Sequence, residues 1–203
     1  MANFMKKFLH VGCGFKQKAQ TTRGFNTPEW AEIRLDIDGS VVPDVIGSMT
    51  DMKAIADGSM DAVFSSHNIE HLYPHEVPLA LSEFLRILNP TGIAVLTCPD
   101  LQSVCALVAD NKLTQAAYQS SAGPIAPIDI LYGHRAAMQR GNLYMAHRCG
   151  FTRDVLHGTL RQAGFASAIV MARPKHFDLW AFASKQALTQ EQLLGLAKTH
   201  GLA

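Results

Sequence analysis

One stretch near the amino end decides the fold class, and it reads Phe8-Leu9-His10-Val11-Gly12-Cys13-Gly14. Its first four residues form a short, mostly apolar run that predicts a strand. The two glycines that follow allow a tight turn, and they leave its backbone free of Cβ atoms. A strand that ends in a glycine turn indicates an α/β protein, provided that strands and helices alternate farther along the chain.

Short apolar runs and helical segments do alternate. Ile33–Ile37 predicts a second strand that carries Asp36 near its end. A helix is predicted between Pro74 and Asn89-Pro90, because apolar residues recur there at helical intervals. Further strands are predicted at Asp44–Gly47, Ala62–Ser65 and Ile93–Thr97, the last preceded by a tight reversal at Gly92. This order predicts crossover connections and a mostly parallel sheet.

The carboxyl-terminal part predicts an antiparallel pair of strands. A helix is expected from a cap at Thr152 to Gly164, followed by strands at Phe165–Met171 and Phe177–Ala183. The segment between these strands is too short for a parallel crossover, which needs about a dozen residues or more. A capping-box pattern, Thr189 with Gln192, then precedes a Leu-rich helix.

The glycine turn and Asp36 form a candidate ligand site. In an open α/β sheet, ligands bind beyond the carboxyl ends of the strands. A glycine turn there lets a ligand approach the backbone, and a strand-end acid can accept two hydrogen bonds from a ribose diol. Either feature alone is a weak signal, but the two in this order are much more specific.

Several segments together resemble the class I S-adenosylmethionine-dependent methyltransferases, in their type 11, small-molecule branch. Leu9–Gly14 looks like the first motif of that family, and Asp36 looks like its ribose-binding acid. Later parts of the family pattern are matched by Gly58–Leu72, Glu83–Gly92, His147–Thr152 and Leu160–Phe165. The resemblance covers most of the chain, except about residues 100–145.

The resemblance implies a Rossmann-like, seven-stranded, mostly parallel sheet with an antiparallel last strand and helices on both faces. It also implies S-adenosylmethionine as the cofactor. The positions that would bind the cofactor are Gly12, Cys13 and Gly14 at the methionine part, Asp36 at the ribose, Ser48 and Met49 at the adenine, and Ser65 and Ser66, with His67, below the sulfonium.

Departures from the family pattern lead to further expectations. The segment after Gly14 is polar and not amphipathic, so the first helix is expected to be short or missing. Ser48 stands where an adenine-side acid is expected. The first strand begins almost at residue 1, so cover for the site is expected from residues 99–150 or from a second copy in a homodimer. We therefore expect one domain, residues 1–203, with 99–150 as a substrate-side lid.

Histidines provide the candidate catalytic and substrate-binding groups. An imidazole at His67, just after the fourth strand, can take the proton of a hydroxyl acceptor. The alternative is that His67 only packs against the cofactor or the substrate. The candidates for substrate contacts come from the lid segment and are His134, Tyr144 and His147.

The spacing of three histidines also raises the question of a metal site. His67, His71 and His75 recur at four-residue intervals, which on one helix would place them on one face. Tyr73-Pro74 interrupts such a helix, so no metal site is expected. The four cysteines show no CxxC pairing, and Cys13 is interpreted as a small residue that fits the glycine turn.

The composition argues against several other classes of protein. Charged residues make up 17% of the 203 residues and the formal net charge is +1, with no basic block that would indicate nucleic-acid binding. No stretch has the roughly 20 apolar residues of a membrane span, and the amino end lacks the features of a signal peptide. We therefore expect a cytoplasmic protein without nucleic-acid or membrane partners.

The sequence favours an enzyme that transfers a methyl group from S-adenosylmethionine to a small or medium-sized acceptor, at oxygen or nitrogen. The alternative is a non-catalytic protein of the same fold that acts as a binding or assembly subunit. A nicotinamide-dependent oxidoreductase fits less well, because the GxGxxG pattern is not completed after Gly14 and the carboxyl-terminal hairpin is not expected there.

Overall fold

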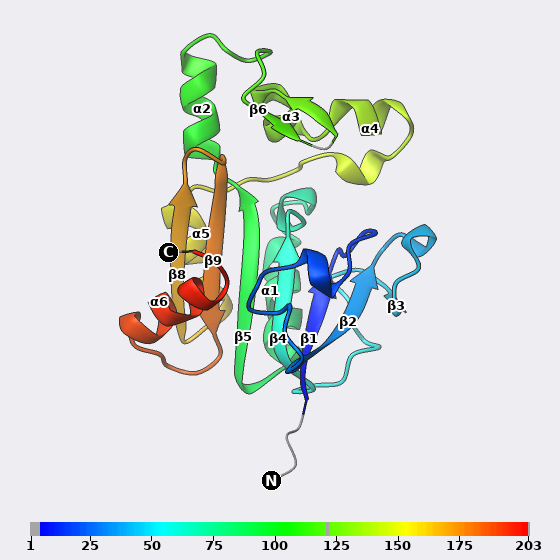
Figure 1. Cartoon of the computed structure of the whole chain (residues 1–203), viewed down its shortest axis with the longest axis vertical. Helices are drawn as coiled ribbons and strands as arrows, with labels where there is room; N and C mark the ends of the chain where they lie inside the picture. The colour runs from blue at the N-terminus through cyan, green and yellow to red at the C-terminus, as the bar shows by residue number, and fades with distance from the viewer. Residues whose placement is uncertain (1–4, 121, 203) are drawn as a thin grey trace.

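The computed structural model describes residues 5–120 and 122–202, and a β-sheet forms its centre (Figure 1). Within these residues, seven strands pair in the order β3-β2-β1-β4-β5-β9-β8. The strands are β1 (Lys6–Val11), β2 (Trp30–Asp36), β3 (Val45–Ile46), β4 (Met60–Ser66), β5 (Leu88–Pro99), β8 (Ser167–Arg173) and β9 (Asp178–Ser184). The order reverses between β1 and β4, and such a switch point is where open α/β sheets bind ligands.

The strand directions confirm the predicted topology. β1 pairs in parallel with both β2 and β4, and β4 pairs in parallel with β5. β9 runs antiparallel to β5 on one side and to β8 on the other. The short turn between β8 and β9 permits only an antiparallel pair. The carboxyl ends of the parallel strands therefore share one edge of the sheet.

Helices and a loop cover the two faces of the sheet (Figure 1). α1 (Val77–Ile87) and α5 (Arg153–Ala163) pack on one face, in the core that contains Leu9. α6 (Gln190–Thr199) covers part of the other face, together with Phe25 from the loop after β1. Because successive side chains of a strand point to opposite faces, the central strands contribute to both cores.

The first crossover, between β1 and β2, lacks an α-helix, as the sequence predicts. Residues 12–29 contain one helical turn, the 3₁₀ segment η1 (Lys18–Gln20). Instead of a helix, Phe25 stacks on Phe8 with ring centroids 4.4 Å apart and also contacts Phe64. Burial of these aromatic rings covers the sheet face where the polar sequence cannot form an amphipathic helix.

Two local predictions were wrong in detail. Gly92 lies within β5 rather than in a reversal before it, because β5 already begins at Leu88. The β4–β5 register shifts between Met60 and Ala62, and this shift accommodates the additional residues of β5 before Ile93. Pro78, rather than Pro74, occupies the first turn of α1. An early-helix proline is tolerated because its missing N–H has no partner within the helix at that position.

Residues 100–120 and 122–150 lie beyond the carboxyl edge of the parallel strands (Figure 1). They form α2 (Leu101–Ala109), the paired strands β6 (Tyr118–Ser120) and β7 (Gly123–Ile125), α3 (Pro127–Tyr132), α4 (Arg135–Gln139) and the 3₁₀ turn η4 (Leu143–Met145). A separate small core that includes Val104, Ile125 and Ile130 joins α2 to β7 and α3.

No helix in the described part of the chain is long and apolar enough to cross a membrane. The four cysteines are free thiols, of which Cys13 and Cys98 are buried. Burial raises the pKa of the Cys13 thiol, which disfavours the thiolate. This agrees with the interpretation of Cys13 as a small residue that fits the turn.

Candidate active site

Two side chains of β2 hold the glycine turn after β1. The N–H of Gly14 donates to Asp36 Oδ2 at 2.8 Å, and Arg34 Nη2 donates to the Gly14 carbonyl at 2.6 Å. Gly12 and Gly14 have φ angles of +60° and +53°, which glycine adopts without a steric clash. The glycine turn and the strand-end acid, paired in the sequence argument, are therefore in direct contact.

Arg34 is a residue of this site that the sequence analysis missed. It lies in the middle of β2 and is only 8% exposed. Its guanidinium also donates, at 2.8 to 3.2 Å, to the carbonyls of Lys16, Val41 and Val42. Arg34 thus ties the loop after β1 to the loop between β2 and β3. Its one signal in the sequence was a charged residue inside an apolar strand.

The two glycines differ in what lies over them. A Cβ on Gly12 would lie 2.1 Å from Asn68 Oδ1, whereas a Cβ on Gly14 would meet nothing within 4 Å. Asn68 Nδ2 donates to the Val11 carbonyl at 2.8 Å and to Ser65 Oγ at 3.3 Å. Gly12 is therefore required by a side chain of the protein itself, while the space beside the Gly14 Cα is open to a ligand.

The other positions predicted to bind the cofactor lie along the same edge of the sheet: Cys13 in the turn, Ser48 and Met49 after β3, and Ser65 and Ser66 at the end of β4. The hydrogen bond from Gly47 N to the Asp36 carbonyl, at 2.9 Å, brings the turn after β3 beside the end of β2. Ser48 Oγ is paired with Thr50 Oγ1 at 2.7 Å. The tertiary structure thus gathers these positions around Asp36 and the ends of β1 and β4.

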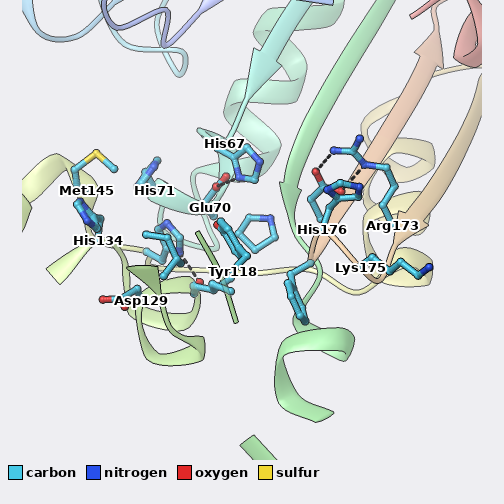
Figure 2. Close-up of a pocket in the computed structure, with 16 residues that line it drawn as sticks. His67, Glu70, His71, Tyr118, Asp129, His134, Met145, Arg173, Lys175 and His176 are labelled. Carbon is cyan, nitrogen blue, oxygen red and sulfur yellow. Dashed lines mark hydrogen bonds and ion pairs between the residues drawn. The ribbon is translucent and has the colours of Figure 1, made fainter. Parts of the chain in front are cut away.

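A cavity of about 360 Å³ lies beyond the ends of β4, β5 and β9 (Figure 2). Its lining comes from three parts of the chain: His67, Glu70 and His71 after β4; Tyr118, Ile125, Asp129, Ile130, His134, Met145 and His147 in the 99–150 segment; and Pro99 with Arg173, Lys175, His176, Phe177 and Asp178 around the β8–β9 turn. The glycine turn and Asp36 are not part of this lining. The cavity is thus a second feature of the site, on the β4–β5 side of the switch point.

His67 follows β4 in a backbone conformation that is unusual for a residue with a Cβ. Its φ angle is +56°, and its N–H donates to the Thr97 carbonyl at 2.9 Å. The side chain is 48% exposed, and Nδ1 lies 3.3 Å from Glu70 Oε1 (Figure 2). Burial by itself lowers the pKa of His67, but the Glu70 carboxylate raises it, and the net shift is upward.

A buried carboxylate lies among three histidines at this wall of the cavity. Glu70 is 1% exposed, and within the described residues neither of its carboxylate oxygens has a hydrogen-bond partner. The contact with His67 is therefore an ion pair without good hydrogen-bond geometry. One donor atom each from Glu70, His71 and His147 lies within 4.8 Å of the other two. Burial raises the pKa of Glu70, but His67, His71 and His147 together lower it by more. The net shift is downward, which favours the ionised carboxylate.

Arg173 lies on the opposite side of the cavity from His71 (Figure 2), and Asp178 lines the cavity as well. Arg173 Nε donates to Asp178 Oδ1 at 2.8 Å, and the guanidinium lies 4.9 Å from the ring centroid of Trp180. Tyr118 of β6 stacks on Phe177 of the β8–β9 turn, with ring centroids 6.2 Å apart. These contacts join the 99–150 segment to the carboxyl-terminal hairpin across the cavity.

The structure brings two of the three predicted substrate residues to this cavity. His134 and His147 line it, whereas Tyr144 is 56% exposed and its neighbour Met145 lines the cavity instead. The two side chains diverge because they are consecutive residues of one 3₁₀ turn, η4. His75 stacks on Tyr73 with ring centroids 5.7 Å apart and does not line the cavity.

Comparisons with known proteins agree with this architecture. Residues 9–96 match the protein family described as methyltransferase domain, Methyltransf_11. No curated protein matches the sequence. Similar solved structures include an S-adenosylmethionine-dependent methyltransferase of Thermotoga maritima, described as a possible histamine N-methyltransferase (14% identity, TM-score 0.55, 89% of this chain and 82% of that one). A second is 1,6-didemethyltoxoflavin-N1-methyltransferase of Burkholderia thailandensis with bound 1,6-didemethyltoxoflavin and S-adenosylhomocysteine (15% identity, TM-score 0.55, 89% of this chain and 71% of that one). A third is an S-adenosylmethionine-dependent methyltransferase of Archaeoglobus fulgidus (15% identity, TM-score 0.55, 90% of this chain and 87% of that one).

The family match over residues 9–96, the strand order and the similar solved structures together show that the chain has the fold of the class I S-adenosylmethionine-dependent methyltransferases. Its residues fit that cofactor at two points. The space beside the Gly14 Cα is open, so a ligand can approach it closely. Asp36 accepts from Gly14 N and, at 2.9 Å, from Asp38 N, which leaves about two of its four acceptor positions for ribose hydroxyls. When bound, S-adenosylmethionine supplies a methyl group on a sulfonium sulfur.

Proposed function

We propose that this protein is a methyltransferase that modifies a small or medium-sized acceptor, at an oxygen or nitrogen atom, in the cavity beyond β4, β5 and β9. The observation that carries the proposal is the position of the cavity, next to the switch point at which open α/β sheets bind ligands. Its volume of about 360 Å³ is typical of small-molecule sites. The Burkholderia enzyme, whose structure holds 1,6-didemethyltoxoflavin beside S-adenosylhomocysteine, supports this class of substrate.

We also propose that residues 99–150 act as the lid of this site. Eight residues of the segment line the cavity, among them Tyr118, His134 and His147. A methyl transfer is an in-line displacement, so the main task of the protein is to hold the acceptor in attack geometry. A wall built from this segment performs that task and keeps water away from the reacting groups.

His67 is the group that we propose takes the proton of a hydroxyl acceptor. Its Nδ1 faces Glu70, so Nε2 is the nitrogen that remains for a substrate. The strained φ angle holds the ring at the cavity wall directly after β4. A positioned base of this kind contributes about 10²- to 10⁴-fold to the rate. An amine acceptor that is already neutral needs this group less.

The test begins with calorimetric binding of S-adenosylhomocysteine, followed by transfer from radiolabelled S-adenosylmethionine to a panel of small hydroxyl and amine compounds. Asp36→Ala is expected to weaken S-adenosylhomocysteine binding at least about 10-fold, through the lost hydrogen bonds. His67→Asn is expected to leave that binding unchanged and to lower kcat on a hydroxyl acceptor at least about 100-fold. His157→Asn, an exposed change on α5, is the control.

Two outcomes would contradict the proposal. If the wild-type protein does not bind S-adenosylhomocysteine, the non-catalytic alternative, a binding or assembly subunit, is favoured. If it binds the cofactor but methylates only macromolecules, the acceptor class is wrong. A His67→Asn variant with wild-type kcat on a hydroxyl acceptor would mean that His67 only packs in the wall.

A further inference from the structure

Glu70, His71 and His147 form a donor set that methyl transfer itself does not require. They meet at one wall of the cavity, with one donor atom from each within 4.8 Å of the other two. We propose that these three side chains bind a divalent transition-metal ion of the zinc class. This site differs from the series His67, His71 and His75 considered in the sequence analysis. Of those three only His71 is a ligand here, and His147 comes from the far end of the lid segment.

Each of the two histidines has one ring nitrogen held by a backbone carbonyl. His71 Nδ1 lies 3.1 Å from the Ala146 carbonyl, and His147 Nδ1 lies 2.8 Å from the Ile130 carbonyl. A ring nitrogen that faces a carbonyl oxygen must carry the hydrogen, so the lone pair is left on Nε2. A backbone carbonyl that fixes the tautomer in this way is the usual outer partner of a metal-bound imidazole.

Glu70 supplies a buried carboxylate without hydrogen bonds, which points to a cation. Its carboxylate is 1% exposed, and neither oxygen has a hydrogen-bond partner among the described residues. An ionised carboxylate buried in this state is unfavourable unless a positive charge offsets it. His67 approaches Oε1, at 3.3 Å, and Oε2 has no hydrogen-bond partner among the described residues. A bound divalent ion satisfies the carboxylate more completely than that contact does.

The backbone around the three donors is held by hydrogen bonds between two distant segments. The N–H groups of Arg148 and Cys149 donate to the Glu70 carbonyl at 2.8 and 3.2 Å, and Arg148 Nη1 donates to the His71 carbonyl at 2.8 Å. The 146–149 segment is therefore fixed against η3 (Ile69–His71). A donor set on such a scaffold is positioned before the ion arrives.

The geometry suits zinc better than magnesium or calcium. Bonds of about 2.0 to 2.2 Å place the ligands of a tetrahedral zinc ion about 3.3 Å apart, so each donor pair has to close by at most about 1.5 Å. Two imidazoles and one carboxylate are ligands of zinc and its neighbours, whereas magnesium and calcium prefer oxygen. All three donors line the cavity, so water from the cavity can complete the coordination.

The experiment is a calorimetric titration of the full chain, without a histidine tag and after dialysis against a chelator, with Zn²⁺ alone. One ion per chain is expected. Glu70→Gln and His147→Ala are expected to weaken its binding at least about 100-fold. The control, His157→Ala, removes an exposed histidine of α5 and should leave the affinity unchanged. Circular dichroism of the metal-free variants checks that they fold.

X-ray absorption of the wild-type zinc complex provides a test that does not depend on variant folding. Nitrogen and oxygen neighbours with an imidazole scattering pattern support the proposal. Sulfur neighbours overturn it, because the ion would then sit on a thiol such as the exposed Cys105. Absence of zinc binding, or binding unchanged in both ligand variants, overturns it as well. The metal site goes beyond the proposed function, and neither zinc measurement contains cofactor or acceptor. The metal proposal and the proposed methyl transfer can therefore fail independently of each other.

Discussion

Asp36 Oδ2 accepts a 2.8 Å hydrogen bond from the N–H of Gly14, and this bond joins the end of β2 to the turn after β1. The second oxygen accepts from the N–H of Asp38 at 2.9 Å. The acid at the end of the second strand therefore shapes the glycine turn from within the chain, in addition to any contact with a ligand. Its structural and binding roles can be separated by substitution.

Asp36→Asn is expected to destabilise the free protein by about 1–3 kcal/mol. The amide keeps one acceptor oxygen, but its NH₂ group then faces the N–H of either Gly14 or Asp38, which loses its partner. Urea unfolding without ligand measures the effect. Asp110→Asn, in the exposed pair with Lys112 at the end of α2, is the matched control and should change stability by less than about 0.5 kcal/mol. Equal stability of Asp36→Asn and wild type would show that this carboxylate does not hold the turn.

Arg34→Lys is expected to destabilise the protein by about 2–4 kcal/mol, although it keeps the charge. A lysine lacks the planar fork with which Arg34 reaches four carbonyl groups, so most of them lose their donor. The loop that carries Gly14 should loosen, and S-adenosylhomocysteine should bind more weakly. Urea unfolding and calorimetry measure the two effects. Arg140→Lys, at an exposed position, serves as the control, and similar small changes in both variants would argue against this role of Arg34.

Gly12→Ala is expected to destabilise the protein by about 2–4 kcal/mol, for two reasons. A Cβ at φ +60° is strained by about 1–2 kcal/mol, and it displaces the Asn68 amide from its hydrogen bonds to Val11 and Ser65. Gly58→Ala isolates the first effect, because Gly58 has φ +62° and nothing within 4 Å of the added Cβ.

A double-mutant cycle measures the contact between Gly12 and Asn68. The variant that combines Gly12→Ala with Asn68→Ala should lose at least about 1 kcal/mol less than the sum of the two single variants, because the clash is present only in Gly12→Ala. Strict additivity would mean that Asn68 does not restrict the space above Gly12.

His200 is expected to make the folded protein less stable in mild acid. It packs against Phe25 and Phe182, and burial lowers its pKa from 6.5 to about 4. Between these values the unfolded chain binds a proton that the folded chain does not, so the free energy of unfolding falls as the pH decreases. At pH 5 this one group accounts for a loss of about 2 kcal/mol relative to pH 7.5.

The measurement compares urea unfolding at pH 7.5 and pH 5 in wild type and in His200→Gln, which cannot titrate. Other histidines contribute equally to both proteins, so the difference between their pH effects isolates His200. A variant that loses as much stability on acidification as wild type would show that His200 is readily protonated in the fold.

The local sequence predicted most of the fold because its signals act over short distances. The apolar run before Gly12, the helical spacing from Val77 and the cap pattern at Thr189 each specify one element without reference to the rest of the chain. The short link between β8 and β9 specified their antiparallel pairing. Even the missing helix after β1 was predicted, because a polar segment has no apolar face to bury.

The sequence by itself determined the order of strands and helices along the chain, the antiparallel last strand, and the pairing of the glycine turn with Asp36, since motif and spacing encode all three. Only the tertiary structure decided that Arg34 and Asn68 brace that turn and that Glu70 lies buried beside His71 and His147. The physical reason is that such groups meet through chain segments far apart in sequence. The burial that makes a carboxylate costly, and a cation favourable beside it, exists only after those segments have packed.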